Sequence, residues 1–85
     1  MKGVNWATRE QKWRATISWR KARYHLGYYT DKAHAGQAHN LAAGRLHGEY
    51  AFLNDLPEML TEVTQTIADR VANHLSKSFR PRRRG

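Results

Sequence analysis

The sequence predicts an α+β fold: a three-stranded antiparallel sheet packed on one helix, followed by a C-terminal amphipathic helix and a basic tail. Three observations lead to this fold. Apolar residues alternate with polar ones through much of the first thirty residues, which is typical of strands. From Asp31 the apolar residues recur at helical spacing, and a second helical stripe begins at Leu60. The chain has 85 residues, of which 40% are hydrophobic, so it can form one small core.

The first part of the chain is predicted to form three short strands. Residues 3–6 are the first candidate, and a polar turn over residues 7–11 follows. Residues 13–19 alternate between an apolar side and a side of Arg, Thr and Ser. After a second turn, residues 23–26 alternate again, and Gly27 is expected to end this strand. The pattern indicates an antiparallel sheet with one buried face and one basic, solvated face.

The next element is predicted as a helix with a face of small residues. Thr30 or Asp31 can cap its first turn, and Gly48 is expected to close it. Small side chains allow a helix to approach a sheet closely, so large sheet residues such as Trp13 and Ile17 can fill the gap. The stripe consists of Ala35, Ala38, Ala42 and Leu46.

A second helix is predicted over residues 55–78, because Asp55, Pro57 and Glu58 resemble a capping box with an early proline. Its continuous apolar stripe consists of Leu60, Val63, Ile67, Val71 and Leu75. Two interpretations remain open for this stripe. Either it packs on its own domain, or it forms a homodimer or binds a partner protein, because so long an apolar face needs a covering surface.

The charge is unevenly distributed along the chain. Fifteen Lys and Arg against seven Asp and Glu give a net charge of +8. Residues 1–30 hold seven basic residues and one acid, and residues 78–85 hold four Arg and no acid, whereas the segment between them is neutral to acidic. Two basic ends favour a polyanionic partner, with nucleic acid ahead of a membrane surface.

Four ordered pieces of the chain resemble a known family. They are Gly3-Val4, residues 12–17 (KWRATI), residues 23–29 (RYHLGYY) and a helix whose exit reads HGEYAFLN at 47–54. Together they are similar to the ethylene-response-factor (Apetala-two) type DNA-binding domain, in the bacterial or phage version that is appended to HNH homing endonucleases. The resemblance covers residues 3–54. It divides the chain into a DNA-binding domain (1–54), a C-terminal helix (55–78) and a basic tail (79–85).

The resemblance implies a sheet laid into the DNA major groove. Arg23 matches an arginine that contacts DNA in the plant domains, and His25 stands where those domains have a contacting tryptophan. Asn5, Ala7, Thr16 and Ser18 stand where they have Arg, Arg, Glu and Arg. These departures leave the target sequence open.

The side chains themselves support a compatible interpretation. Arginine pairs with phosphates or guanine, asparagine suits adenine, and Thr, Ser and His are adaptable donors. The alternative is that the strands simply carry polar residues on a solvated face. The residues expected to contact DNA are Asn5, Arg9, Arg14, Thr16, Ser18, Arg20, Arg23 and His25 in the sheet region, and Arg80, Arg82, Arg83 and Arg84 as a basic arm.

Neither an enzyme, a cofactor nor a metal site is expected. The chain has no Cys, and no nucleophile elbow, phosphate loop, carboxylate pair or His-Asn-His nuclease module is found. The gaps between His34, His39 and His47 do not place ligands on one helix face, so His39 is expected to pack and His47 to support the helix exit. Of the tryptophans, Trp6 and Trp13 are expected in the core, while Trp19 is ambiguous.

The sequence therefore favours a small double-stranded DNA-binding protein that acts as a transcriptional regulator or accessory factor in a bacterial cytoplasm. It is a dimer if the C-terminal helix forms a homodimer. The alternative is an interaction protein whose C-terminal helix binds a host or partner protein, with DNA contact secondary. Binding of single strands or RNA is a third hypothesis. No segment has the length of a membrane span.

Overall fold

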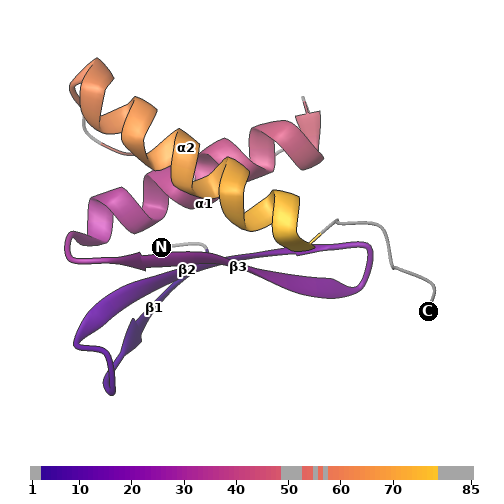
Figure 1. Cartoon of the computed structure of the whole chain (residues 1–85), viewed down its shortest axis with the longest axis horizontal. Helices are drawn as coiled ribbons and strands as arrows, with labels where there is room; N and C mark the ends of the chain where they lie inside the picture. Colours follow the sequence, from indigo (N-terminus) through magenta and orange to yellow (C-terminus); the bar gives the residue numbers. More distant parts are fainter. Residues whose placement is uncertain (1–2, 49–52, 55, 57, 79–85) are drawn as a thin grey trace.

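The computed structural model describes residues 3–48, 53, 54, 56 and 58–78, which form a sheet and two helices (Figure 1). The strands β1 (Val4–Ala7), β2 (Lys12–Trp19) and β3 (Ala22–Tyr29) pair antiparallel in the order β1-β2-β3. The helices are α1 (Lys32–Leu46) and α2 (Thr61–Ser78). The predicted α+β fold, a three-stranded sheet followed by two helices, is confirmed.

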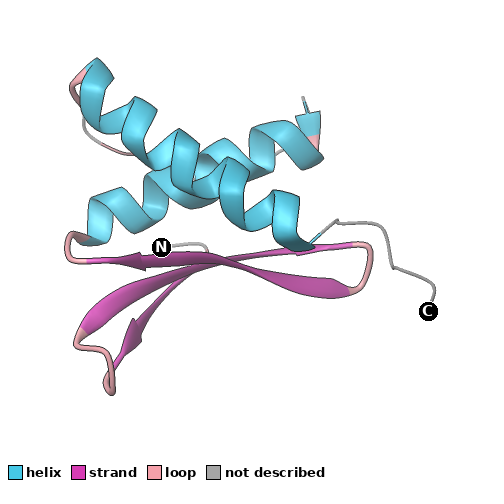
Figure 2. Cartoon of the chain, in the orientation of Figure 1, coloured by secondary structure: helices cyan, strands magenta, loops and turns pink. Residues whose placement is uncertain are grey.

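The two helices lie on the same side of the sheet and cross each other, as Figure 2 shows. α1 packs on the sheet, and α2 packs against both α1 and the edge strand β3. No helix or strand of the described residues covers the opposite side of the sheet. We call this opposite side the open face.

The core forms where the small residues of α1 meet the sheet. Ala35, Ala38 and Ala42 are fully buried, as their spacing predicts, and Ala15 on β2 is fully buried as well. Because four side chains of this size fill little space, the helix and the sheet can approach closely. The larger members of the buried core are Ile17, Leu26, Tyr29, Ile67, Val71 and Leu75.

The ends of α1 agree with the sequence signals. The Asp31 carboxylate accepts a hydrogen bond of 2.8 Å from the Ala33 N–H and so caps the first turn. At the other end the His47 N–H donates to the Ala43 carbonyl, and Gly48 follows with φ +61°. A glycine at this position takes the left-handed conformation at little cost, so the helix ends there.

The expected end of the third strand at Gly27 is wrong, because β3 continues to Tyr29. Gly27 has φ +113°, and the pairing with β2 passes from Ala15–Gly27 to Thr16–His25, which leaves Leu26 as an extra residue. This β-bulge places Leu26 in the core and preserves the pairing on both sides. Alternation alone gives no sign of a bulge, so the sequence pattern predicts a strand end at this glycine.

The second helix begins later than predicted, at Thr61 instead of Asp55. The first intrahelical bond runs from the Thr64 N–H to the Leu60 carbonyl. Asp55 and Pro57 of the expected capping box lie outside the described residues. The described residues before Thr61 are not helical, and Met59 among them is half-buried against the core.

The apolar stripe of α2 is used largely within the chain. Ile67, Val71 and Leu75 are buried in the core, and Val63 packs against it half-buried. Leu60 precedes the helix and is 72% exposed. The three buried side chains are therefore unavailable to a second copy or a partner. Within the described ranges, neither helix has the length and hydrophobicity needed to cross a membrane.

Trp6 does not lie in the core as expected, because it is 47% exposed. It meets the half-buried Trp13 edge to face, with ring centroids 5.0 Å apart. The end of the β1–β2 hairpin points away from the helices (Figure 1). The Lys32 ammonium lies 5.1 Å from the Trp13 ring and partly shields it.

Candidate nucleic-acid interface

The open face is built by alternate residues of the three strands. The strand register aligns Asn5, Arg14 and Tyr28 in one row across the sheet. Thr16 pairs with His25 in the next row. The complete open face consists of Asn5, Ala7, Lys12, Arg14, Thr16, Ser18, Arg23, His25 and Tyr28.

The strand residues of this face are basic or uncharged, while Glu10 in the β1–β2 loop lies near enough to act on His25. None of the three strands contains Asp or Glu, whereas Lys12, Arg14 and Arg23 are basic. Arg14 lies on the central strand, and its Nε atom is buried without a hydrogen-bond partner in the described part of the chain. A buried donor left unpaired is costly. Arg14 is half-buried, so it brings a positive charge to the middle strand of the open face.

The predicted contact residues of the strands differ in accessibility. Asn5, Ser18 and Arg23 are exposed, and Arg14 and His25 are half-buried. Thr16 is only 8% exposed, so little of its side chain remains for a ligand. The register brings all of these onto one face, which is the arrangement that a surface for an extended polyanion requires.

The other predicted contacts lie in turns or outside the described residues. Arg9 is exposed in the loop between β1 and β2. Arg20 occupies the turn between β2 and β3, where its guanidinium carbon lies 4.5 Å from the Trp19 ring centroid. Trp19, whose environment the sequence leaves open, is half-buried there. Arg80, Arg82, Arg83 and Arg84 fall outside the described residues.

Sequence reasoning missed a contact between α2 and the open face. The His74 ring of α2 meets the His25 ring edge to face, with centroids 5.3 Å apart. The centroid of the Tyr28 ring lies 4.8 Å from that of His25. Gly27 makes room for this contact, because an added Cβ would lie 3.2 Å from the His74 Nε2 atom.

Burial lowers the pKa of both histidines below the usual value. For His25, the nearby His74 and Arg14 lower the pKa further, while Glu10 partly opposes them. For His74, burial is again the main cause, followed by Lys77 and Arg70. Both rings are therefore predominantly neutral at pH 7, and each can accept or donate a hydrogen bond.

A second contact from α2 supports the same strand. The Arg70 Nη1 donates to the Tyr28 carbonyl over 3.2 Å, and the guanidinium carbon lies 5.0 Å from the Tyr29 ring. The buried Tyr29 hydroxyl donates to the Leu26 carbonyl over 2.8 Å. Burial raises the pKa of Tyr29, and Arg70 partly offsets this effect. These contacts hold the bulge of β3 in place.

His39 supports the central strand from the helix side, in agreement with its expected packing role. It is 5% exposed, and its Nδ1 atom lies 3.1 Å from the Thr16 carbonyl. The Thr16 N–H donates to the Gly3 carbonyl at the start of β1. A Cβ on Gly3, which has φ +71°, would lie 2.5 Å from the Thr16 carbonyl. Glycine is thus required where the chain enters the sheet.

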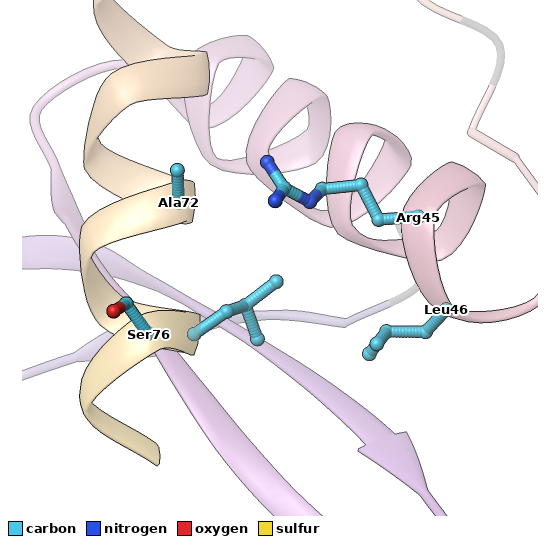
Figure 3. Close-up of a pocket in the computed structure, with 5 residues that line it drawn as sticks. Arg45, Leu46, Ala72 and Ser76 are labelled. Atoms are coloured by element: carbon cyan, nitrogen blue, oxygen red, sulfur yellow. The ribbon is translucent and has the colours of Figure 1, made fainter. Parts of the chain in front are cut away.

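Other features of the described residues offer no comparable site. Arg45 and Leu46 of α1 and Ala72, Leu75 and Ser76 of α2 line a hollow between the helices, shown in Figure 3. It belongs to the helical layer, on the side of the sheet away from the open face. Within the described residues, no three His, Asp or Glu side chains come close enough to hold a metal ion.

No protein-family model matches this chain, and no match to it was found among curated proteins.

Proposed function

We propose that this chain is a small, non-enzymatic protein that binds double-stranded DNA by placing the open face in the major groove. The observation that carries the proposal is the row of basic strand residues on the open face, with Arg14 on the central strand and no Asp or Glu in any of the three strands. The resemblance to the ethylene-response-factor domain gives the same orientation, and the three-strand-and-helix fold agrees with it.

The dimensions of the sheet suit this partner. Neighbouring strands lie about 4.8 Å apart, so three strands span roughly 10 Å between the outer axes. The major groove is about 12 Å wide and accepts strands as well as helices. The sheet can therefore enter the groove, with Arg9 and Arg20 at its two turns near the phosphates that border the groove.

Each side chain of the face has a role in the proposal. Arg14 and Arg23 donate to guanine edges or phosphates, and Asn5 pairs with adenine. His25 and Tyr28 form an adaptable aromatic pair beside Arg14. Such a protein acts as a transcriptional regulator or accessory DNA-binding factor in the cytoplasm of a bacterial cell, with the basic tail as an additional arm.

The proposal is tested by fluorescence anisotropy of the full chain with labelled duplex DNA across a salt series. We expect binding whose log–log salt dependence corresponds to several phosphates. Arg14→Ala and Arg23→Ala each remove a groove contact and should weaken binding by about 1–3 kcal/mol, which is roughly fivefold to 150-fold.

Arg45→Ala is the matched control, because Arg45 is an exposed arginine of α1 outside the open face. Its binding should stay close to that of the unmodified chain. Equal losses in all three variants would mean that only total charge matters. Tighter binding to the matching single strand, or no binding at low salt, would contradict the proposal.

A further inference from the structure

One side of α2 carries three basic or titratable residues that the open-face proposal does not use. Arg70, His74 and Lys77 follow each other at four- and three-residue spacing, which places them on one flank of the helix. We call this flank the basic edge of α2. Ala72 and Ser76 lie on the other flank, where they line the hollow beside α1.

The basic edge adjoins the open face. Arg70 bonds to the Tyr28 carbonyl, and the His74 ring touches the His25 ring, so both residues lie along β3. α2 and β3 therefore run in opposite directions along this edge of the sheet. Lys77, about one helical turn after His74, follows on the side toward Arg23. Figure 1 shows the end of α2 approaching the sheet on the side of the β2–β3 hairpin.

The charges of α2 are sorted around its axis. Its acids are Glu62 and Asp69, both exposed, and Asp69 accepts a hydrogen bond from Gln65 at 3.0 Å. Successive residues are rotated by about 100° around the helix axis. Viewed down this axis, both acids are rotated about 60° or more from Lys77, on the side away from the core. Among the charged and titratable residues of α2, the side that borders the open face therefore presents Arg70, His74 and Lys77, and neither acid.

A sheet that lies in the major groove has a phosphate backbone along each border. The β3 border of the sheet is the one that α2 flanks. Lys77 is exposed there, and its ammonium is a mobile donor well suited to phosphate.

We propose that the basic edge of α2 contacts the phosphate backbone that borders β3, with Lys77 as the phosphate ligand and the His25–His74 contact joining the two surfaces. This inference rests on the proposed DNA binding and extends it to a helix outside the resemblance. It gives α2 a role in binding beyond packing on the core.

The test compares Lys77→Gln with Arg45→Gln, which removes the same charge from the helical layer away from the basic edge. The salt dependence of binding to one duplex is measured for both full-length variants and the unmodified chain. Loss of one phosphate contact should lower the slope of log affinity against log salt by about 0.9 and weaken binding roughly threefold to tenfold at 0.1 M salt. Arg45→Gln should leave the slope nearly unchanged.

A second measurement distinguishes a direct contact from a general charge effect. Single phosphates of a tightly bound duplex are replaced, one at a time, by neutral methylphosphonate. If Lys77 contacts a phosphate, one replacement should weaken the unmodified chain but have little further effect on Lys77→Gln, since the pair is already broken.

The outcomes separate the two proposals. Equal slopes for Lys77→Gln and Arg45→Gln, with the unmodified chain binding duplex DNA and Arg14→Ala impaired, would overturn the role of the basic edge alone. Absence of duplex binding by the unmodified chain would overturn both. Circular dichroism of the variants should match that of the unmodified chain, because Lys77 is exposed.

Discussion

Three non-glycine residues of the described part of the chain adopt left-handed backbone conformations: Gln11 at φ 58°, Arg20 at φ 51° and Lys21 at φ 67°. A side chain in this region costs about 1 kcal/mol or more. Arg20 and Lys21 together form the turn between β2 and β3, where Asn-Gly is the usual choice. Two cations at this turn therefore cost stability and place charge at the border of the open face.

Lys21→Gly separates these two effects. Removing the Cβ should raise the free energy of unfolding by about 0.5–1 kcal/mol, since the turn is relieved of strain. The same change should weaken duplex binding a few-fold, because one charge near the phosphates is lost. Chemical denaturation and anisotropy titration measure the two effects.

Gln11→Gly is the neutral control for that experiment. Gln11 ends the β1–β2 loop, where its N–H donates to the Ala7 carbonyl over 2.8 Å. Glycine there relieves the backbone but also removes the hydrogen bond of 2.8 Å from the Gln11 Nε2 to the Thr8 carbonyl, so it should stabilise the fold by less and leave DNA affinity unchanged. If both variants bind DNA equally well, the charge of Lys21 has no part in binding.

At the scale of single elements, α2 stabilises the fold through a small number of buried side chains. Ile67→Ala should lower the free energy of unfolding by about 2–5 kcal/mol, because it leaves a cavity beside β3 and α1. Leu60→Ala should change it by less than about 0.5 kcal/mol, since Leu60 is largely exposed. Urea denaturation compares the two variants.

The same pair of variants tests how the stripe is used. If the stripe instead formed a dimer surface, Leu60→Ala would also be destabilising, and the midpoint of unfolding would rise with protein concentration. A midpoint independent of concentration supports packing within the chain.

The elements also show what sequence patterns can predict. Alternation in residues 13–19 and the spacing of the α1 alanines identified the sheet and its helix, because each pattern reflects one local period. The bulge at Gly27 and the start of α2 depend on contacts with distant residues, His74 and the core. The open face was predictable from its strands, but the basic edge beside it was not, since no local signal joins α2 to β3.

At the scale of the whole molecule, the His25–His74 contact links stability to pH. Both pKa values are lowered by folding, so the unfolded chain binds protons more readily than the folded one. Stability should therefore be greatest above the ordinary histidine pKa of about 6.5 and decline as the pH falls through that value toward the lowered ones. The charged neighbours that oppose protonation are Arg14, Arg70 and Lys77, whereas Glu10 favours it.

Thermal unfolding between pH 7 and pH 5 measures this dependence. His74→Gln should show a smaller decline in melting temperature than the unmodified chain, because it removes one of the two groups and relieves the other. An identical decline in both proteins would mean that other groups control the acid response.

The bulge at Gly27 has a consequence for how this surface can change in evolution. Before it, odd-numbered residues of β3 face outward, as Arg23 and His25 do; after it, the parity is reversed and the even-numbered Tyr28 faces outward. Since only glycine takes φ +113° readily, a substitution at Gly27 favours an unbroken alternation in which Tyr28 turns inward and Tyr29 outward. Substitutions at the outward positions alter the chemistry of the surface one side chain at a time. A change at Gly27 would instead reverse which residues face outward over the whole end of the strand. Substitutions at this codon are therefore expected to be accepted far less often than substitutions at the codons around it.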